Sequence, residues 1–151
     1  MKLAEALILR GDLQKRLEQL RQRLTASALV QEGEKPAEDP EALLNELDRV
    51  TRELEQLIGR INLTNASRKK EGNTLTELLA RREVLLQQKI SVLQSLLETA
   101  SRTVIRGSRN EVRIQSTVSV PQLRKQTDEL SRQLRLLDTS IQSANWSIDL
   151  K

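Results

Sequence analysis

Residues 40–61, PEALLNELDRVTRELEQLIGRI, show the pattern on which the whole chain is built. Apolar side chains recur in this stretch at alternating spacings of four and three residues, as in a helix packed against another helix. They are Leu43, Leu47, Val50, Leu54, Leu57 and Ile61. Asp39 precedes Pro40, which favours a helix start because the carboxylate accepts unpaired amide protons and proline has none. The stretch predicts a helix over residues 40–66.

Three further segments repeat this pattern and predict helices over residues 2–30, 74–100 and 120–147. In the first of them, the positions of the stripe are occupied by Leu3, Ala6, Arg10, Leu13, Leu17, Leu20 and Leu24. In the last of them, the positions of the stripe are occupied by Leu123, Thr127, Leu130, Leu134, Leu137, Ile141 and Ala144.

The helix predicted over residues 74–100 has the widest apolar surface. Thr74 and Glu77 have the spacing of a capping box, in which each side chain satisfies the backbone amide of the other residue. One apolar stripe consists of Leu79, Leu86, Ile90, Leu93 and Leu97. The adjacent stripe consists of Leu78, Leu85, Val92 and Leu96. A face of this width predicts contact with more than one neighbouring helix.

The connections between the helices contain turn and strand patterns. The Gly72-Asn73 pair predicts a turn between the second and third helices. Between the third and fourth helices, apolar and polar residues alternate, the apolar ones being Val112, Ile114 and Val118. This alternation predicts a short β-hairpin over residues 103–118.

Helices of matched length joined by short connections favour antiparallel packing. We expect a mainly all-α fold with a single domain over residues 1–151, an antiparallel four-helix bundle of coiled-coil helices with the β-hairpin between helices three and four. The alternative is a pair of extended helical hairpins that bury their seams against another subunit. An isolated β-hairpin is marginally stable in water, and Trp146 is the only aromatic residue. Both features favour a homo-oligomer.

The composition disfavours most kinds of catalysis. The chain has no cysteine and no histidine, which excludes disulfides, thiolate chemistry, and the commonest proton-transfer group and metal ligand. Its five glycines are scattered, so no glycine-rich phosphate loop exists. The first residues show neither a signal peptide nor a membrane span. We expect a cytoplasmic, non-enzymatic protein with no cofactor, no metal site and no membrane partner.

Two arginines occupy unusual positions in the helical pattern. Arg10 lies at a core position of the first helix, and Arg82 falls between the two stripes of the third helix. In one interpretation each arginine lays its methylene groups along the seam and extends its guanidinium into water. In the other, each pairs with a buried carboxylate or amide and so fixes helix register and oligomeric state.

A polar cluster is predicted at one end of the bundle. Asn62 and Asn65 lie near the end of the second helix, and Asn145 and Trp146 near the end of the fourth. In an up-down-up-down bundle these two ends lie at the same pole. The four residues are a candidate polar pole and a candidate small-molecule pocket, with helix capping as the structural alternative.

Basic residues gather in two places. The predicted hairpin holds a candidate anion-binding set, Arg102, Arg106, Arg109 and Arg113. The first helix has a basic face formed by Lys15, Arg16, Arg21 and Arg23. Basic side chains can neutralise nucleic-acid phosphates. Against this, no aromatic residues interleave for base stacking, and 25 basic residues face 21 acidic ones, so nucleic acid is not the favoured partner.

Several stretches together resemble the small bacterial proteins known as septicolysin-like. They are MKLAEAL at residues 1–7, VQEGEKPAEDP at 30–40, RINLTNAS at 60–67 and NWSIDL at 145–150. The resemblance implies a compact cytoplasmic bacterial protein of helices with a hairpin, and it implies no biochemical activity. The family name suggests cytolytic activity, but no feature of this sequence supports such an activity.

The favoured function is that of a non-enzymatic, self-associating helical protein that acts through protein-protein interaction with a partner of unknown identity. One alternative is a nucleic-acid-binding accessory protein that uses the arginine hairpin. A second alternative is a small-molecule-binding helical bundle.

Overall fold

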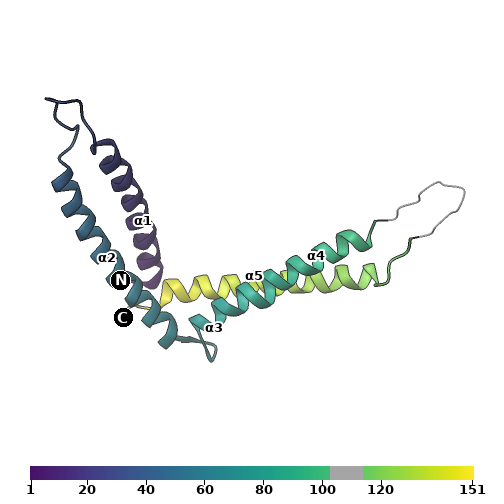
Figure 1. Ribbon diagram of the computed structural model, residues 1–151. Helices are drawn as coiled ribbons and strands as arrows, with labels where there is room; N and C mark the ends of the chain where they lie inside the picture. The colour runs from purple at the N-terminus through teal and green to yellow at the C-terminus, as the bar shows by residue number, and fades with distance from the viewer. Residues whose placement is uncertain (103–113) are drawn as a thin grey trace, which may run out of the picture. The chain divides into compact units, whose positions relative to one another are not determined.

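The computed structural model describes residues 1–102 and 114–151 (Figure 1). These residues form long helices and one two-stranded sheet, so the predicted mainly all-α fold is confirmed. They divide into two compact units, described separately below. Unit 1 comprises Met1–Lys69 and Ala144–Lys151, and unit 2 comprises Lys70–Ser143. A single domain closed as one four-helix bundle stays a prediction.

Unit 1 is built on helices α1 (Leu3–Ala26) and α2 (Pro40–Ser67), which lie side by side (Figure 1). Its core contains Leu3, Leu13, Leu20, Leu43, Val50, Leu57 and Ile61, so both predicted stripes are confirmed as buried faces. The Asp39 carboxylate accepts a hydrogen bond from the Glu41 amide at 3.1 Å and caps α2 as expected. Helix α1 ends four residues before the predicted residue 30. Beyond Leu24 no stripe residue remains to hold a further turn by packing, and Leu29 is 90% exposed.

The small sheet lies between α2 and α3, where a turn was predicted. Strands β1 (Lys69–Lys70) and β2 (Asn73–Thr74) pair around Glu71 and Gly72. Both turn residues have positive φ, 53° and 87°, as the type I′ turn of a two-residue hairpin requires. Of the hairpin predicted over residues 103–118, residues 103–113 lie outside the described residues, and residues 114–118 form no strand.

The third predicted helix is observed as one continuous helical stretch with a π-helical centre. It consists of α3 (Leu75–Ala80), η1 (Arg81–Gln88) and α4 (Lys89–Ala100). The predicted capping box at its start is confirmed. The Thr74 amide donates to Glu77 Oε2 at 2.7 Å, and the Glu77 amide donates to Thr74 Oγ1 at 3.2 Å.

The spacing of the core side chains explains the π-helical segment. Leu78, Arg82, Leu86 and Ile90 follow one another at intervals of four residues, and the three leucine and isoleucine side chains are buried. In a regular α-helix, each four-residue step passes a full turn by about 40°, so three steps would rotate the last side chain by about 120°. The wider π turn takes up this drift and keeps the four residues on one side.

Helix α5 (Val120–Ser147) has the predicted bounds, and its Asp138 pairs with Arg82 of η1 (Figure 1). Thr127 and Ile141 are buried in unit 2, and Ala144, which belongs to unit 1, is fully buried. The predicted stripe of α5 is therefore its packed face.

Candidate functional site

Unit 1 contains all four residues of the candidate polar pole. Asn65 and Asn145 are half-buried, Asn62 is exposed, and Trp146 is 57% exposed. Among the described residues, the three asparagine side chains make no hydrogen bond to the rest of the protein. The four residues lie in the same unit, and the polar pole stays a prediction.

The polar contacts in this region come from residues that the sequence patterns did not single out. The Lys151 amide donates to Thr64 Oγ1 at 3.0 Å, and Arg60 Nε donates to the Lys151 carbonyl oxygen at 2.6 Å. The Thr64 hydroxyl also donates to the Arg60 carbonyl at 2.8 Å, and the residue is fully buried. The register could have identified Thr64, because it lies three residues after Ile61 and continues the α2 stripe.

The first residues of α1 pair with the chain that follows α5. The Leu3 amide donates to the Ile148 carbonyl at 2.9 Å, and the Leu150 amide donates to the Met1 carbonyl at 3.0 Å. Lys2 Nζ lies 2.8 Å from Asp149 Oδ1, and this ammonium group lowers the pKa of the Asp149 carboxyl. We call these contacts, with those of Thr64 and Arg60 to Lys151, the clasp. It closes unit 1 across residues distant in sequence.

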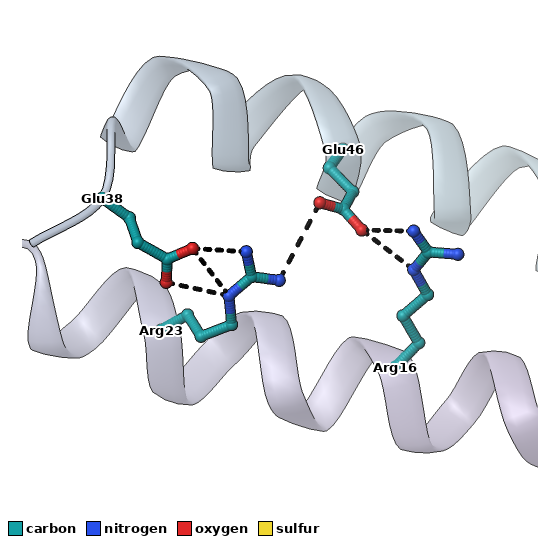
Figure 2. A network of polar contacts seen from close by, with 4 residues as sticks. All are labelled: Arg16, Arg23, Glu38 and Glu46. Atoms are coloured by element: carbon teal, nitrogen blue, oxygen red, sulfur yellow. Dashed lines mark hydrogen bonds and ion pairs between the residues drawn. The ribbon is translucent and has the colours of Figure 1, made fainter.

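A ladder of ion pairs connects α1 to α2 and its preceding loop (Figure 2). Arg16 donates to Glu46 Oε1 from Nη2 at 2.6 Å, Arg23 Nη1 lies 3.9 Å from Glu46 Oε2, and Arg23 Nε donates to Glu38 Oε2 at 2.9 Å. Hydrogen bonds from Arg16 and Arg23 lower the pKa values of Glu46 and Glu38, respectively. Because these folded-state values are lowered, the ladder stabilises unit 1 above the ordinary carboxyl pKa and weakens as the pH falls through the lowered values.

The ladder also changes the interpretation of the basic face on α1. Besides Arg16 and Arg23, Arg21 pairs with Glu18 at 2.6 Å, and Lys15 Nζ lies 3.8 Å from Asp12. Each of the four cations therefore has a carboxylate neighbour, which reduces the charge available to a polyanion. In the predicted arginine hairpin, Arg102 pairs with Glu98 at 2.6 Å, and the other three arginines, Arg106, Arg109 and Arg113, lie outside the described residues.

The two candidate register residues differ in their partners. Arg82 Nη1 lies 3.4 Å from Asp138 Oδ1 and joins η1 to α5 within unit 2, whereas Arg10 has no ion pair among the described residues. Both side chains are half-buried, and the Nε atom of each is buried without a hydrogen-bond partner. Arg82 thus has a carboxylate partner, although the Asp138 side chain is 46% exposed and is not the buried group of the register hypothesis, whereas Arg10 has no such partner among the described residues.

Unit 2 exposes most of one of the two apolar stripes predicted on the third helix. Leu86 and Ile90 of the first stripe are buried. In the second stripe, Leu78 is buried, whereas Leu85, Val92 and Leu96 face outward. Together with Val84, these form what we call the exposed stripe: Val84 (51% exposed), Leu85 (56%), Val92 (68%) and Leu96 (40%). The large apolar residues exposed in unit 1 are spread over α1, the α1–α2 loop and the two ends of α2, as Ile8, Leu29, Leu44 and Leu63 show.

Unit 2 also contains a pocket beside the β1–β2 turn, which we call the hairpin pocket. Its volume is about 360 Å³. The apolar part of its wall is formed by Leu78, Leu86, Leu136 and Leu137, and the polar part by Glu71, Asn73, Arg81, Gln133 and Ser140. Leu78 and Leu86 are buried, whereas Glu71, Asn73, Arg81 and Gln133 are exposed. The pocket therefore has an apolar floor and a polar rim with one cation and one anion.

Neither a membrane span nor a metal site is found in residues 1–102 and 114–151. No helix there combines the length and the apolar character needed to cross a bilayer. No group of three carboxylates in those ranges is arranged to hold a metal ion.

The chain is similar to proteins whose functions are not described. A family model described as "Family of unknown function (DUF6847)" matches residues 10–150, and no curated protein matches. A crystal structure of a functionally unknown conserved protein from Corynebacterium diphtheriae is 37% identical, with a TM-score of 0.86 over 100% of this chain and 99% of that chain. The chain belongs to this family of unknown function, DUF6847.

Proposed function

We propose that this chain is a non-enzymatic, self-associating protein that acts through protein-protein interaction, and that the exposed stripe is the surface through which two copies meet. The observation that carries the proposal is the exposure of four large apolar side chains along one helical stretch, between 40% and 68% each. The absence of histidine and cysteine from the sequence supports a role other than catalysis.

A second copy is the partner that the stripe fits best. Val92 and Leu96 are four residues apart within α4, which is the spacing of neighbours on one face of an α-helix, and Val84 and Leu85 extend the exposed stripe into η1. A two-fold contact uses the same patch on both subunits. In an antiparallel pair, the Leu85 end of one stripe lies beside the Leu96 end of the other, so apolar groups meet along its length.

The size of the stripe predicts how strong this association is. A stable interface buries about 800 Å² on each partner and involves about 20 to 30 residues a side. Four large side chains and their polar neighbours form a smaller surface than this. We therefore expect a reversible dimer with a dissociation constant of about 1 to 100 μM, rather than a permanent one.

The test is the absolute mass by light scattering over a concentration series, at low and high salt, with absorbance at 260 nm recorded. The mass of the unsubstituted protein should rise with concentration from 17.2 kDa toward twice that value. Val92→Lys should remain monomeric because it places a charge within the seam. Lysine favours helices at least as well as valine, so the helix itself should remain intact.

Leu29→Lys is the matched control, because Leu29 is 90% exposed in the α1–α2 loop of unit 1. It introduces the same charge away from the stripe and should dimerise like the unsubstituted protein. A mass that stays at 17.2 kDa at all concentrations, or equal dimerisation of Val92→Lys, would overturn the proposal. A complex that absorbs at 260 nm and dissociates in salt would favour the nucleic-acid alternative instead.

A further inference from the structure

The hairpin pocket lies where the backbone of unit 2 departs from regular geometry. Glu71 is the only described residue other than glycine with a positive φ. A type I′ turn favours Asn-Gly or Asp-Gly, since these residues tolerate this conformation, whereas glutamate does not. The turn is therefore formed by a residue that the turn itself disfavours, and that residue lines the pocket.

The opposite wall has a second irregularity. Arg81 and Leu86 both line the pocket and both belong to the π-helical segment η1. Such segments are rare, and they occur frequently at functional sites. The four-residue spacing of the core side chains explains why η1 is π-helical. It does not explain why the first residue of η1 is an arginine at the rim of a pocket.

The charges at the rim are available to a ligand. Among the described residues, neither Arg81 nor Glu71 forms an ion pair, and the Ser140 hydroxyl makes no hydrogen bond. Asn73 and Gln133 add amide groups to the same rim. An arginine favours a carboxylate, a glutamate favours an ammonium group, and the leucines of the floor favour a branched apolar chain.

We infer that the hairpin pocket binds a small zwitterion with an apolar side chain, namely a leucine-like amino acid or the dipeptide that contains it. The ligand carboxylate pairs with Arg81, its ammonium group with Glu71, and its side chain packs among the four leucines. A volume of about 360 Å³ lies near the lower end of ligand pockets, which restricts the ligand to this size class. A ligand of so few atoms should bind with a dissociation constant of about 10 μM to 1 mM.

The experiment is a titration of ¹⁵N-labelled protein with L-leucine and with leucyl-leucine, followed by the amide chemical shifts of Glu71, Asn73, Gln133 and Ser140. Two analogues of leucine each lack one charge: 4-methylpentanoate has no amine, and 3-methylbutylamine has no carboxylate. Each should bind about two- to fivefold more weakly, because each loses one ion pair at an exposed rim. Comparing leucine with leucyl-leucine identifies the free amino acid or the peptide as the better ligand.

Glu71→Asn separates binding from folding. Asparagine suits the turn better than glutamate, so this variant should unfold at a higher temperature than the unsubstituted protein. It lacks the carboxylate, so it should bind leucine about two- to fivefold more weakly. Glu83→Gln, an exposed carboxylate of η1 that does not line the pocket, is the matched control and should bind as the unsubstituted protein does.

Leu136→Trp tests the apolar part of the pocket without disturbing the core, because Leu136 is 58% exposed. The larger side chain should occupy the pocket and abolish the shifts. No saturable shift up to about 10 mM of either ligand would overturn the inference, because that concentration exceeds the weakest expected dissociation constant. The inference would also be overturned if either analogue bound as tightly as leucine, or if Glu71→Asn bound leucine as tightly as the unsubstituted protein does.

Discussion

Unit 1 and unit 2 are both built from long helices, but they differ in how their helices are held. In unit 1, the ladder of Arg16, Arg23, Glu38 and Glu46 connects α1 to α2 and its preceding loop, and the clasp closes the end. In unit 2, the ion pair of Arg82 with Asp138 joins η1 to α5. In unit 1, these polar contacts join both long helices and both ends of the chain.

The same contrast appears in the apolar surface and in the backbone. The π-helical segment, the positive φ of Glu71, the exposed stripe and the hairpin pocket all belong to unit 2. Real proteins depart from consistent local rules mainly at functional sites. The difference is the reason why both of our proposals, self-association and ligand binding, place the interacting surface on unit 2.

The largest effects should come from the two cores and should show whether the units unfold separately. Leu20→Ala in unit 1 and Ile90→Ala in unit 2 each remove a buried side chain, 0% and 7% exposed, and each should lower the free energy of unfolding by about 3 kcal/mol. Trp146 is the only aromatic residue and belongs to unit 1. In urea unfolding, its fluorescence should therefore report Leu20→Ala, while Ile90→Ala should affect mainly the far-ultraviolet circular dichroism.

Leu44→Ala is the control for this comparison, because Leu44 is 51% exposed on α2 and should change the free energy of unfolding by less than about 0.5 kcal/mol. Identical shifts of both probes by both core variants would show that the two units unfold as one cooperative block.

A smaller effect should come from the clasp. Thr64→Val keeps the shape of a fully buried side chain but removes the hydroxyl that binds the Lys151 amide, and should lower the free energy of unfolding by about 1 to 2 kcal/mol. Thr51→Val is the matched control. The Thr51 hydroxyl makes the same local bond, to the Leu47 carbonyl at 2.8 Å, but lies exposed.

Hydrogen exchange provides the second measurement for the clasp. The Leu150 and Lys151 amides should exchange faster in Thr64→Val than in the unsubstituted protein, and at unchanged rates in Thr51→Val. Equal changes in the two variants would mean that the threonine's local bond, and not the clasp, stabilises unit 1.

The sequence predicted the positions of the four long helices better than it predicted the contacts between them. Leucine and isoleucine spacing identified α2 and α5 to within one residue, because burial of one helical face dictates that spacing. The ladder and the clasp could not be predicted, since each depends on which exposed side chains the packed helices bring within a few ångströms. The π-helical segment was also not predicted. A single four-residue step between side chains on the packed face is common in an ordinary α-helix, and only three such steps in a row indicate a wider turn.

The smallest effect, and the most direct test of the register hypothesis, compares the two half-buried arginines. Arg10→Met keeps an unbranched apolar chain along the α1 seam and removes a buried Nε atom that has no partner, so the free energy of unfolding should rise by about 1 kcal/mol. Arg82→Met removes an equally unpaired Nε but also separates Asp138 from its cation. The gain and the loss should nearly cancel, leaving a change within about 0.5 kcal/mol.

Urea unfolding measures both variants, and light scattering on the same samples measures the mass. If Arg10→Met instead destabilises unit 1 or changes the mass, Arg10 has a partner in the assembled protein that one chain does not provide, and it fixes the register of subunits. If only Arg82→Met changes the mass, the Arg82–Asp138 pair positions the exposed stripe for self-association. Unchanged mass in both would assign the two guanidinium groups to packing within each unit, because a register residue must alter assembly when it is replaced.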